Sequence, residues 1–167
     1  TVDIRLHCDG GSVSEGWAIY DKLRASGKEI SAIAEGKVAS MATIIMMAAP
    51  KERRKAYKSA NICVHNPWVP SYALGDSLTA EDLRKTAEGL QKEQDKMLDL
   101  YVERCECNRD EMQSLMNEDK FIDTDRAKAL GIISEIIAPA SAKKGSNNNN
   151  FNNMAKTGNV EVKQNLL

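Results

Sequence analysis

The chain has 167 residues, of which 42% are hydrophobic, so it is long and apolar enough for one domain with a buried core. Its formal net charge of −1 gives no reason to expect nucleic acid as a partner. No apolar stretch reaches the ~18 residues of a membrane span and no leader sequence opens the chain, so we expect a cytoplasmic protein without a membrane partner.

The first part of the chain predicts strands and helices in alternation. Apolar residues alternate through residues 2–8, which is typical of a strand, and the helix that follows ends at Gly27. Residues 30–34 indicate the next strand, so parallel strands joined by helices are expected. His7 lies inside the first strand and is interpreted as a hydrogen-bonded strand residue. The strongly basic residues 51–58 are interpreted as a solvated helix end and turn.

The cysteines give no metal-site pattern. Cys8, Cys63, Cys105 and Cys107 are scattered, and neither the Cys-x-Cys pair nor the two histidines have a zinc-ligand spacing. We expect reduced thiols in a cytosol and no bound metal.

A glycine pair separates the first strand from the first helix. Gly10 and Gly11 permit positive φ and a close approach of the backbone, so an N–H group can turn toward a ligand oxygen. The alternative is an ordinary tight turn between a strand and a helix.

Ser40 is a candidate nucleophile. It precedes an apolar run, residues 43–49, that Pro50 closes, so it stands at the expected N-terminus of a buried helix. Unsatisfied N–H groups at a helix start stabilise a developing oxyanion. The alternative role is a simple helix cap.

His65 is a candidate general base. It ends the short apolar strand of residues 62–65, and Asn66-Pro67 breaks that strand directly after the imidazole. A histidine at such a position can accept the proton of a serine near neutral pH and return it to a leaving amine. A structural histidine remains the alternative.

Asp119 is the candidate acid of a Ser-His-Asp triad, because a carboxylate can hold an imidazole in the required tautomer. Glu118 and Asp123 compete for this role. Asp123 is better explained as the N-cap of a helix over residues 124–130, and Glu118 as a solvated charge at the end of the preceding helix.

Between His65 and Asp119, apolar residues recur at helical spacing over residues 80–103, with Thr79 as the expected cap. The spacing predicts a long amphipathic helix with one solvent-exposed polar face. By itself this pattern fits a surface helix packed on its own domain.

These segments together resemble the proteolytic subunit of the Clp protease, the ClpP family, over residues 2–137. The resemblance rests on four runs in register, which are residues 9–21, residues 36–42, residues 64–67 and residues 119–133. It implies an α/β fold, the ClpP/crotonase-like ββα spiral with a protruding handle helix. It also implies a serine endopeptidase in which Ser40 is the nucleophile, His65 the base, Asp119 the orienting acid, and Gly11 and Met41 the oxyanion donors.

The resemblance further implies partners. The family's handle helix interlocks two rings, so a homo-oligomer is expected, a heptameric ring or stacked rings. The chain has no Gly-x-x-x-x-Gly-Lys-Ser/Thr loop, so no cofactor is expected and any ATP-driven unfolding would need a separate unfoldase. Where housekeeping bacterial members usually have Ser-Pro-Gly-Gly, this chain has Cys-Asp-Gly-Gly at residues 8–11, and Asn66 stands where they have Gln. It is similar instead to phage and prophage members, which implies capsid or scaffold proteins as substrates.

The chain is expected to divide into a peptidase domain at residues 1–140, an Asn-rich flexible linker at residues 141–153 and a tail of unknown role at residues 154–167. The family has a further strand and helix ahead of the first strand seen here. Two other functions stay open. One is a catalytically idle shell or scaffold component, and the other is a crotonase-like acyl-CoA enzyme, which does not need Ser40 and His65.

Overall fold

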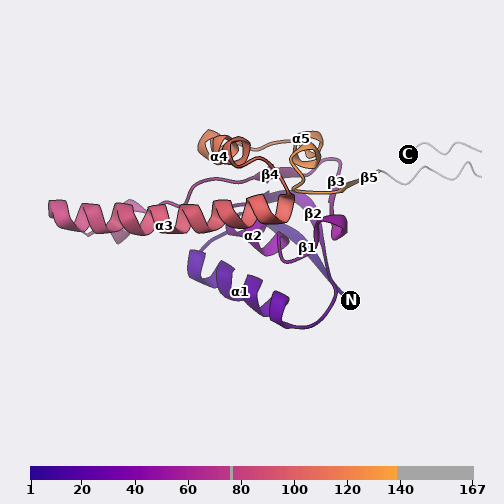
Figure 1. Cartoon of the computed structure of the whole chain (residues 1–167), viewed down its shortest axis with the longest axis horizontal. Helices are drawn as coiled ribbons and strands as arrows, with labels where there is room; N and C mark the ends of the chain where they lie inside the picture. The colour runs from indigo at the N-terminus through magenta and orange to yellow at the C-terminus, as the bar shows by residue number, and fades with distance from the viewer. Residues whose placement is uncertain (76, 139–167) are drawn as a thin grey trace, which may run out of the picture.

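The computed structural model describes residues 1–75 and 77–138 (Figure 1). The linker and the tail expected at residues 141–153 and 154–167 lie outside the described residues. None of the described helices has the length and apolar character needed to cross a membrane.

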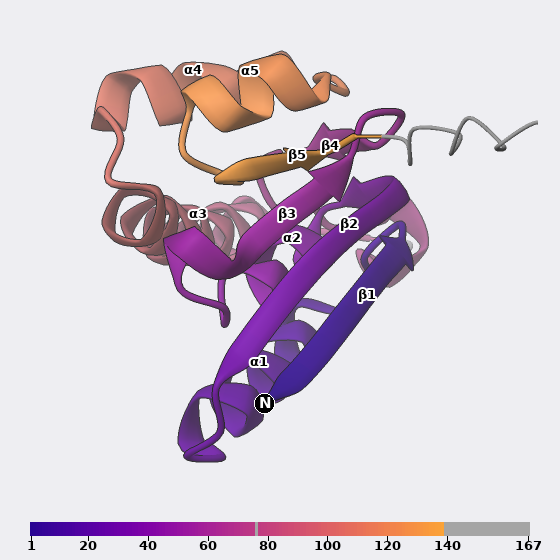
Figure 2. The same ribbon diagram turned by 90° about the vertical axis from the view of Figure 1, so that its right-hand side faces the viewer.

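Within the described residues, five strands form one parallel sheet in the order β1-β2-β3-β5, with β4 also paired to β2 (Figure 2). The strands are β1 (Val2–Cys8), β2 (Ile30–Ala39), β3 (Arg54–Tyr57), β4 (Asn61–Cys63) and β5 (Glu135–Ile137). The first half of β2 pairs with β3 and its second half with β4, so the end of β2 lies beside the end of β4.

The helices are α1 (Val13–Ala25), α2 (Met41–Met46), α3 (Ala80–Cys105), α4 (Arg109–Glu118) and α5 (Thr124–Ala129), with short 3-10 helices at Lys51–Arg53 and Ser71–Ala73. The short helix α2 contacts α1, α3, β1 and β2, so it lies at the centre of the molecule. The predicted parallel α/β arrangement is confirmed. The largest fully buried apolar side chains of the core include Ile44, Met46, Met47, Ile62, Tyr101, Met112, Leu115 and Ile132.

Strand β2 is longer than predicted because it continues through Gly36 as far as Ala39. Gly36 has φ +60°, and a Cβ there would lie 2.7 Å from Nδ1 of His7. The register of the β1/β2 pair shifts between Leu6 and Cys8, which is the irregularity expected of a glycine bulge. The N–H of Lys37 donates to Nδ1 of His7 at 3.1 Å, so the prediction of a hydrogen-bonded strand histidine is confirmed.

The prediction of a solvated helix end and turn over residues 51–58 is wrong. The segment forms a 3-10 turn followed by the inner strand β3, in which Arg54 is fully buried. The guanidinium of Arg54 donates to the carbonyl oxygens of Arg104 (2.5 Å) and Gly131 (3.2 Å) and contacts the sulfur of Met47. Arg104 lies in the last turn of α3 and Gly131 just beyond the end of α5, where carbonyl groups lack donors within the helix. Supplying those donors allows a basic residue to be buried in this strand. Burial lowers the pKa of Arg54.

The long helix α3 begins with a capping box in which Thr79 and Asp82 bond each other's backbone N–H groups, so the predicted cap is confirmed. Its first part extends away from the sheet, and Leu83 there is 52% exposed (Figure 1). Its second part is fixed to α1. Nε1 of Trp17 donates to Glu93 at 3.1 Å, and the Lys96 ammonium lies 3.8 Å from the centre of the indole ring.

Candidate active site

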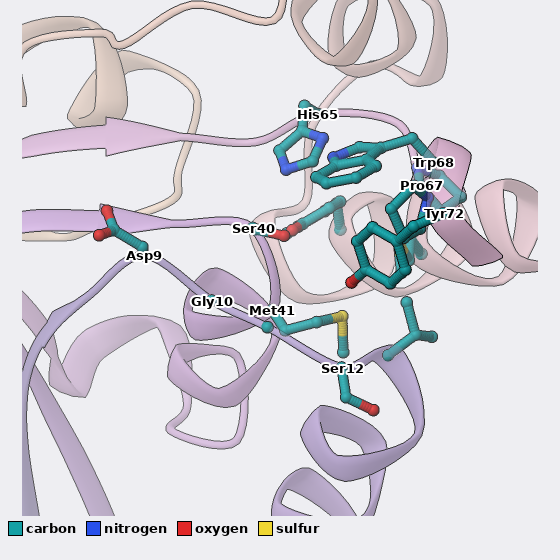
Figure 3. Close-up of a pocket in the computed structure, with 14 residues that line it drawn as sticks. Asp9, Gly10, Ser12, Ser40, Met41, His65, Pro67, Trp68 and Tyr72 are labelled. Carbon is teal, nitrogen blue, oxygen red and sulfur yellow. The ribbon is translucent and has the colours of Figure 1, made fainter.

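An open cavity of about 610 Å³ lies where β1, β2 and β4 end (Figure 3). Its lining includes four of the five predicted site residues, Gly11, Ser40, Met41 and His65. The structure therefore brings together residues that are up to 54 positions apart in the chain, because the turns after three parallel strands meet at one edge of the sheet.

Ser40 has a strained backbone. It joins β2 to α2 with φ +56° and ψ −132°, a combination that residues other than glycine rarely adopt. Although it stands at the N-cap position, its side chain makes no capping hydrogen bond, so the hydroxyl stays available to the cavity. A serine held on a sharp turn between a strand and a helix is the arrangement that exposes the nucleophilic hydroxyl in α/β-hydrolases.

Backbone contacts on both sides hold this conformation. The N–H of Ser40 donates to the carbonyl of Cys63 at 2.9 Å, and the hydroxyl of Thr43 donates to the carbonyl of Ser40 at 2.6 Å. The Thr43 hydroxyl also contacts the Tyr101 hydroxyl at 2.5 Å, deep in the core. Through Cys63 of β4 and Tyr101 of α3, these bonds hold the Ser40 turn against the core.

The glycine turn packs directly on Ser40. A Cβ at Gly10 would lie 2.5 Å from Cβ of Ser40 and 2.9 Å from the backbone N of Met41, so only glycine permits this approach. At Gly11 nothing lies within 4 Å of an added Cβ, which leaves the residue open to the cavity. The glycine pair is therefore more than a tight turn, since it brings the backbone of one loop against the candidate nucleophile.

Two backbone donors line the cavity without partners. Within residues 1–75 and 77–138, the N–H groups of Gly11 and Met41 meet no acceptor. The Met41 N–H is the first of α2 and has no acceptor inside the helix. A pair of such donors beside a serine hydroxyl is what an oxyanion hole requires.

His65 is half-buried and faces Ser40 across the upper part of the cavity (Figure 3). Its Nδ1 lies 2.7 Å from the carbonyl oxygen of Asn66. Because a carbonyl only accepts, Nδ1 carries the proton in this arrangement and Nε2 is left as the basic nitrogen. No hydrogen bond joins Ser40 and His65 in the described part of the chain.

Asp119 lies outside this cavity. It terminates α4 in a left-handed conformation, with φ +47°, and lines a neighbouring cavity together with Asn66 and Asn117. Among the described residues, no hydrogen bond or ion pair joins Asp119 to His65. Burial raises the pKa of the Cys63 thiol in β4, and the negative charge of Asp119 raises it further.

The two competing carboxylates have structural partners. Glu118 forms a two-pronged ion pair with Arg126 at 3.0 and 2.6 Å, and this pair lowers the pKa of Glu118. Asp123 accepts the N–H of Arg126 at 2.9 Å as the N-cap of α5, as predicted. These bonds tie both groups to α5, which leaves Asp119 as the carboxylate without such a role.

The sequence interpretation missed two aromatic residues of the cavity. Trp68 and Tyr72 line it and are 66% and 89% exposed (Figure 3). Two aromatic residues around Pro70, shortly after His65, were the available signal in a chain with 5% aromatic residues. Large exposed aromatic surfaces beside a cavity offer contact area to a bound chain.

Comparison with known proteins identifies the family of the chain. A family model described as Clp protease matches residues 1–140. The chain belongs to the Clp protease family. It is 28% identical over 144 residues to an ATP-dependent Clp protease proteolytic subunit of Bdellovibrio bacteriovorus, an alignment that covers 86% of this chain and 67% of that protein.

Family membership confirms the predicted ClpP-like α/β fold and makes peptidase chemistry the activity to test at this cavity. Among the described residues, no group of three or more histidine, cysteine, aspartate or glutamate side chains is arranged to hold a metal ion.

Proposed function

We propose that the chain is a serine endopeptidase and that the cavity around Ser40 is its active site. The observation that carries the proposal is the strained, uncapped Ser40 beside His65 and two unpartnered N–H groups. Residues held in rarely populated backbone conformations, as Ser40 is, cluster at active sites.

In this mechanism Oγ of Ser40 attacks the carbonyl carbon of a peptide while Nε2 of His65 takes its proton. The N–H groups of Gly11 and Met41 stabilise the oxyanion. The C–N bond then breaks, His65 returns the proton to the leaving amine, and water hydrolyses the resulting ester by the same steps. Asp119 is assigned as the triad acid that favours the charged imidazolium. In the conformation described here it acts from the neighbouring cavity rather than through a direct bond.

The proposal extends to assembly and substrates. We assign a cytoplasmic homo-oligomer, a heptameric ring or stacked rings, in which the projecting part of α3 contacts another copy. An enclosed site admits extended peptides and excludes folded proteins. The natural substrates are then either chains delivered by an ATP-driven unfoldase or, in a phage-type role, capsid and scaffold proteins.

The test compares wild type with Ser40→Ala on short fluorogenic peptides. We expect the substitution to lower kcat by at least about 10⁴-fold, because triad members act as a unit. Ser26→Ala is the matched control, since Ser26 caps the far end of α1. Undiminished cleavage by Ser40→Ala would refute the assignment. Light scattering and digestion of a folded substrate, with and without ATP and an unfoldase, test the assembly and the partner.

A further inference from the structure

Four amide side chains form a continuous hydrogen-bonded chain beside the active site. Asn66 donates to Oδ1 of Asn117 at 2.8 Å, and Gln113 donates to the same oxygen at 2.9 Å. Gln113 also approaches Oδ1 of Asn66 at 3.4 Å, and Gln94 donates to Oε1 of Gln113 at 3.1 Å. We refer to these residues as the amide relay.

The relay joins three separate parts of the fold. Asn66 belongs to the segment after β4, Gln113 and Asn117 lie one helical turn apart on α4, and Gln94 lies on α3. Three of its members are half-buried, and Asn117 is exposed. Its bonds all run from an amide N–H to an amide oxygen. The bond from Gln94 to Gln113 and the bond from Gln113 to Asn117 follow one another, so the first polarises the second, and the bond from Asn66 ends on the same Asn117 oxygen.

One end of the relay lies at the imidazole. The carbonyl oxygen of Asn66 accepts a hydrogen bond from the N–H at Nδ1 of His65, with 2.7 Å between Nδ1 and the oxygen. The direction of that carbonyl depends on the backbone of Asn66, which Pro67 restricts from one side and the anchored Asn66 side chain from the other. Fixing the side chain therefore fixes the acceptor that selects the tautomer of His65.

We propose that Asn66, Asn117, Gln113 and Gln94 are positioning residues that hold His65 in its basic-Nε2 tautomer and connect its orientation to α3. This inference rests on the proposed function, because it assigns His65 as the base. It gives the Asn66 carbonyl the orienting role that Asp119, in the neighbouring cavity, does not fill by direct contact. A movement of α3 relative to α4 would then act on catalysis through Gln94 and Gln113.

The test uses leucine substitutions at positions where glutamine and leucine have similar helix propensity. Gln113→Leu removes the centre of the relay, and Gln94→Leu removes its bond to α3. Gln91→Leu is the matched control, because Gln91 lies one turn away on the same helix and, within residues 1–75 and 77–138, its side chain bonds only Asp95. Each variant is assayed for kcat and KM on a short peptide, for its thermal unfolding midpoint, and for fluorophosphonate labelling of Ser40.

We expect Gln113→Leu to lower kcat about five- to tenfold with KM unchanged, because losing a net hydrogen bond corresponds to about that factor. Gln94→Leu is expected to lower kcat about two- to fourfold, and Gln91→Leu to match wild type. Wild-type values of kcat in both relay variants would overturn the proposal, as would a change in KM alone.

Two further readouts keep the outcome unambiguous. If Gln113→Leu lowers the unfolding midpoint, Gln94→Leu becomes the variant that tests the relay. A kcat of Gln94→Leu equal to that of Gln91→Leu then overturns the proposal. Absence of Ser40 labelling in wild type refutes the proposed function itself. Labelling of Ser40 together with unchanged kcat in both relay variants refutes the relay alone.

Discussion

Replacing Gly10 with alanine tests whether the glycine turn is built for contact with Ser40. The added Cβ would lie 2.5 Å from Cβ of Ser40, 2.8 Å from the carbonyl oxygen of Ala39 and 2.9 Å from the backbone N of Met41. Two of these three atoms are backbone, so a side-chain rotation cannot relieve the overlap. The turn itself must move away from the serine.

Gly27→Ala is the matched control. Gly27 also has a positive φ, +67° against +94° for Gly10, but nothing lies within 4 Å of its added Cβ. Both substitutions carry the conformational cost of a non-glycine residue at positive φ, about 1–2 kcal/mol. Gly10→Ala adds the cost of overpacking, typically ~1–3 kcal/mol, so we expect it to lower the free energy of unfolding by roughly 2–5 kcal/mol.

The effect on activity follows from the displaced turn. If Gly11 supplies one oxyanion donor, moving it away from Ser40 lowers kcat on a short peptide about 10²- to 10³-fold. Denaturant titration and steady-state kinetics measure the two effects. A Gly10→Ala enzyme with kcat within about twofold of that of Gly27→Ala would refute the role given to this turn.

Three further substitutions and treatments address other parts of the molecule. Arg54→Met leaves two helix-end carbonyls without donors and should lower the free energy of unfolding by about 2–4 kcal/mol; unchanged stability would contradict the role of the buried guanidinium. Iodoacetamide should alkylate the exposed Cys8 in the folded protein and spare Cys105, because burial raises the pKa of the Cys105 thiol to about 11; equal labelling by peptide mass spectrometry would contradict this. Arg126 lowers the pKa of Glu118, so the stability from this pair is present above the unfolded pKa of ~4.3 and is lost as pH falls through the lower folded value. The unfolding midpoints of wild type and Glu118→Gln should therefore differ at about pH 6 and converge in acid, whereas a constant difference would exclude the pair as the cause.

Local sequence was sufficient to predict most of the elements. Alternating apolar residues identified β1, and the caps Thr79 and Asp123 marked the starts of α3 and α5, because these signals act over a few neighbouring residues. Strand β3 was missed because its burial depends on carbonyls contributed by Arg104 and Gly131, far along the chain. A local pattern of basic residues contains no information about such partners.

The candidate active site was likewise predictable where local sequence decides and not where contacts between distant residues decide. Ser40 could be proposed from its position at the start of an expected buried helix, and His65 from its position at the end of a strand. The structure places both on one cavity. The positive φ of Ser40 could not be predicted, since its surroundings include residues distant in the chain, such as Cys63, whose carbonyl accepts the Ser40 N–H. The amide relay also depends on how α3 packs against α4, which places Gln94 beside Gln113. Residue types and spacing alone do not specify that contact.

The most direct test of the central claim is labelling with a fluorophosphonate, in which Oγ of the nucleophilic serine displaces fluoride and retains the phosphonyl group. Intact mass followed by peptide mapping locates the label. We predict one label per chain on Ser40, absent in Ser40→Ala and retained in Ser26→Ala. Ser12 lines the same cavity, but its hydroxyl caps α1 by accepting the N–H of Glu15. A label on Ser12, or no label on an enzyme that still cleaves peptides, would contradict the account.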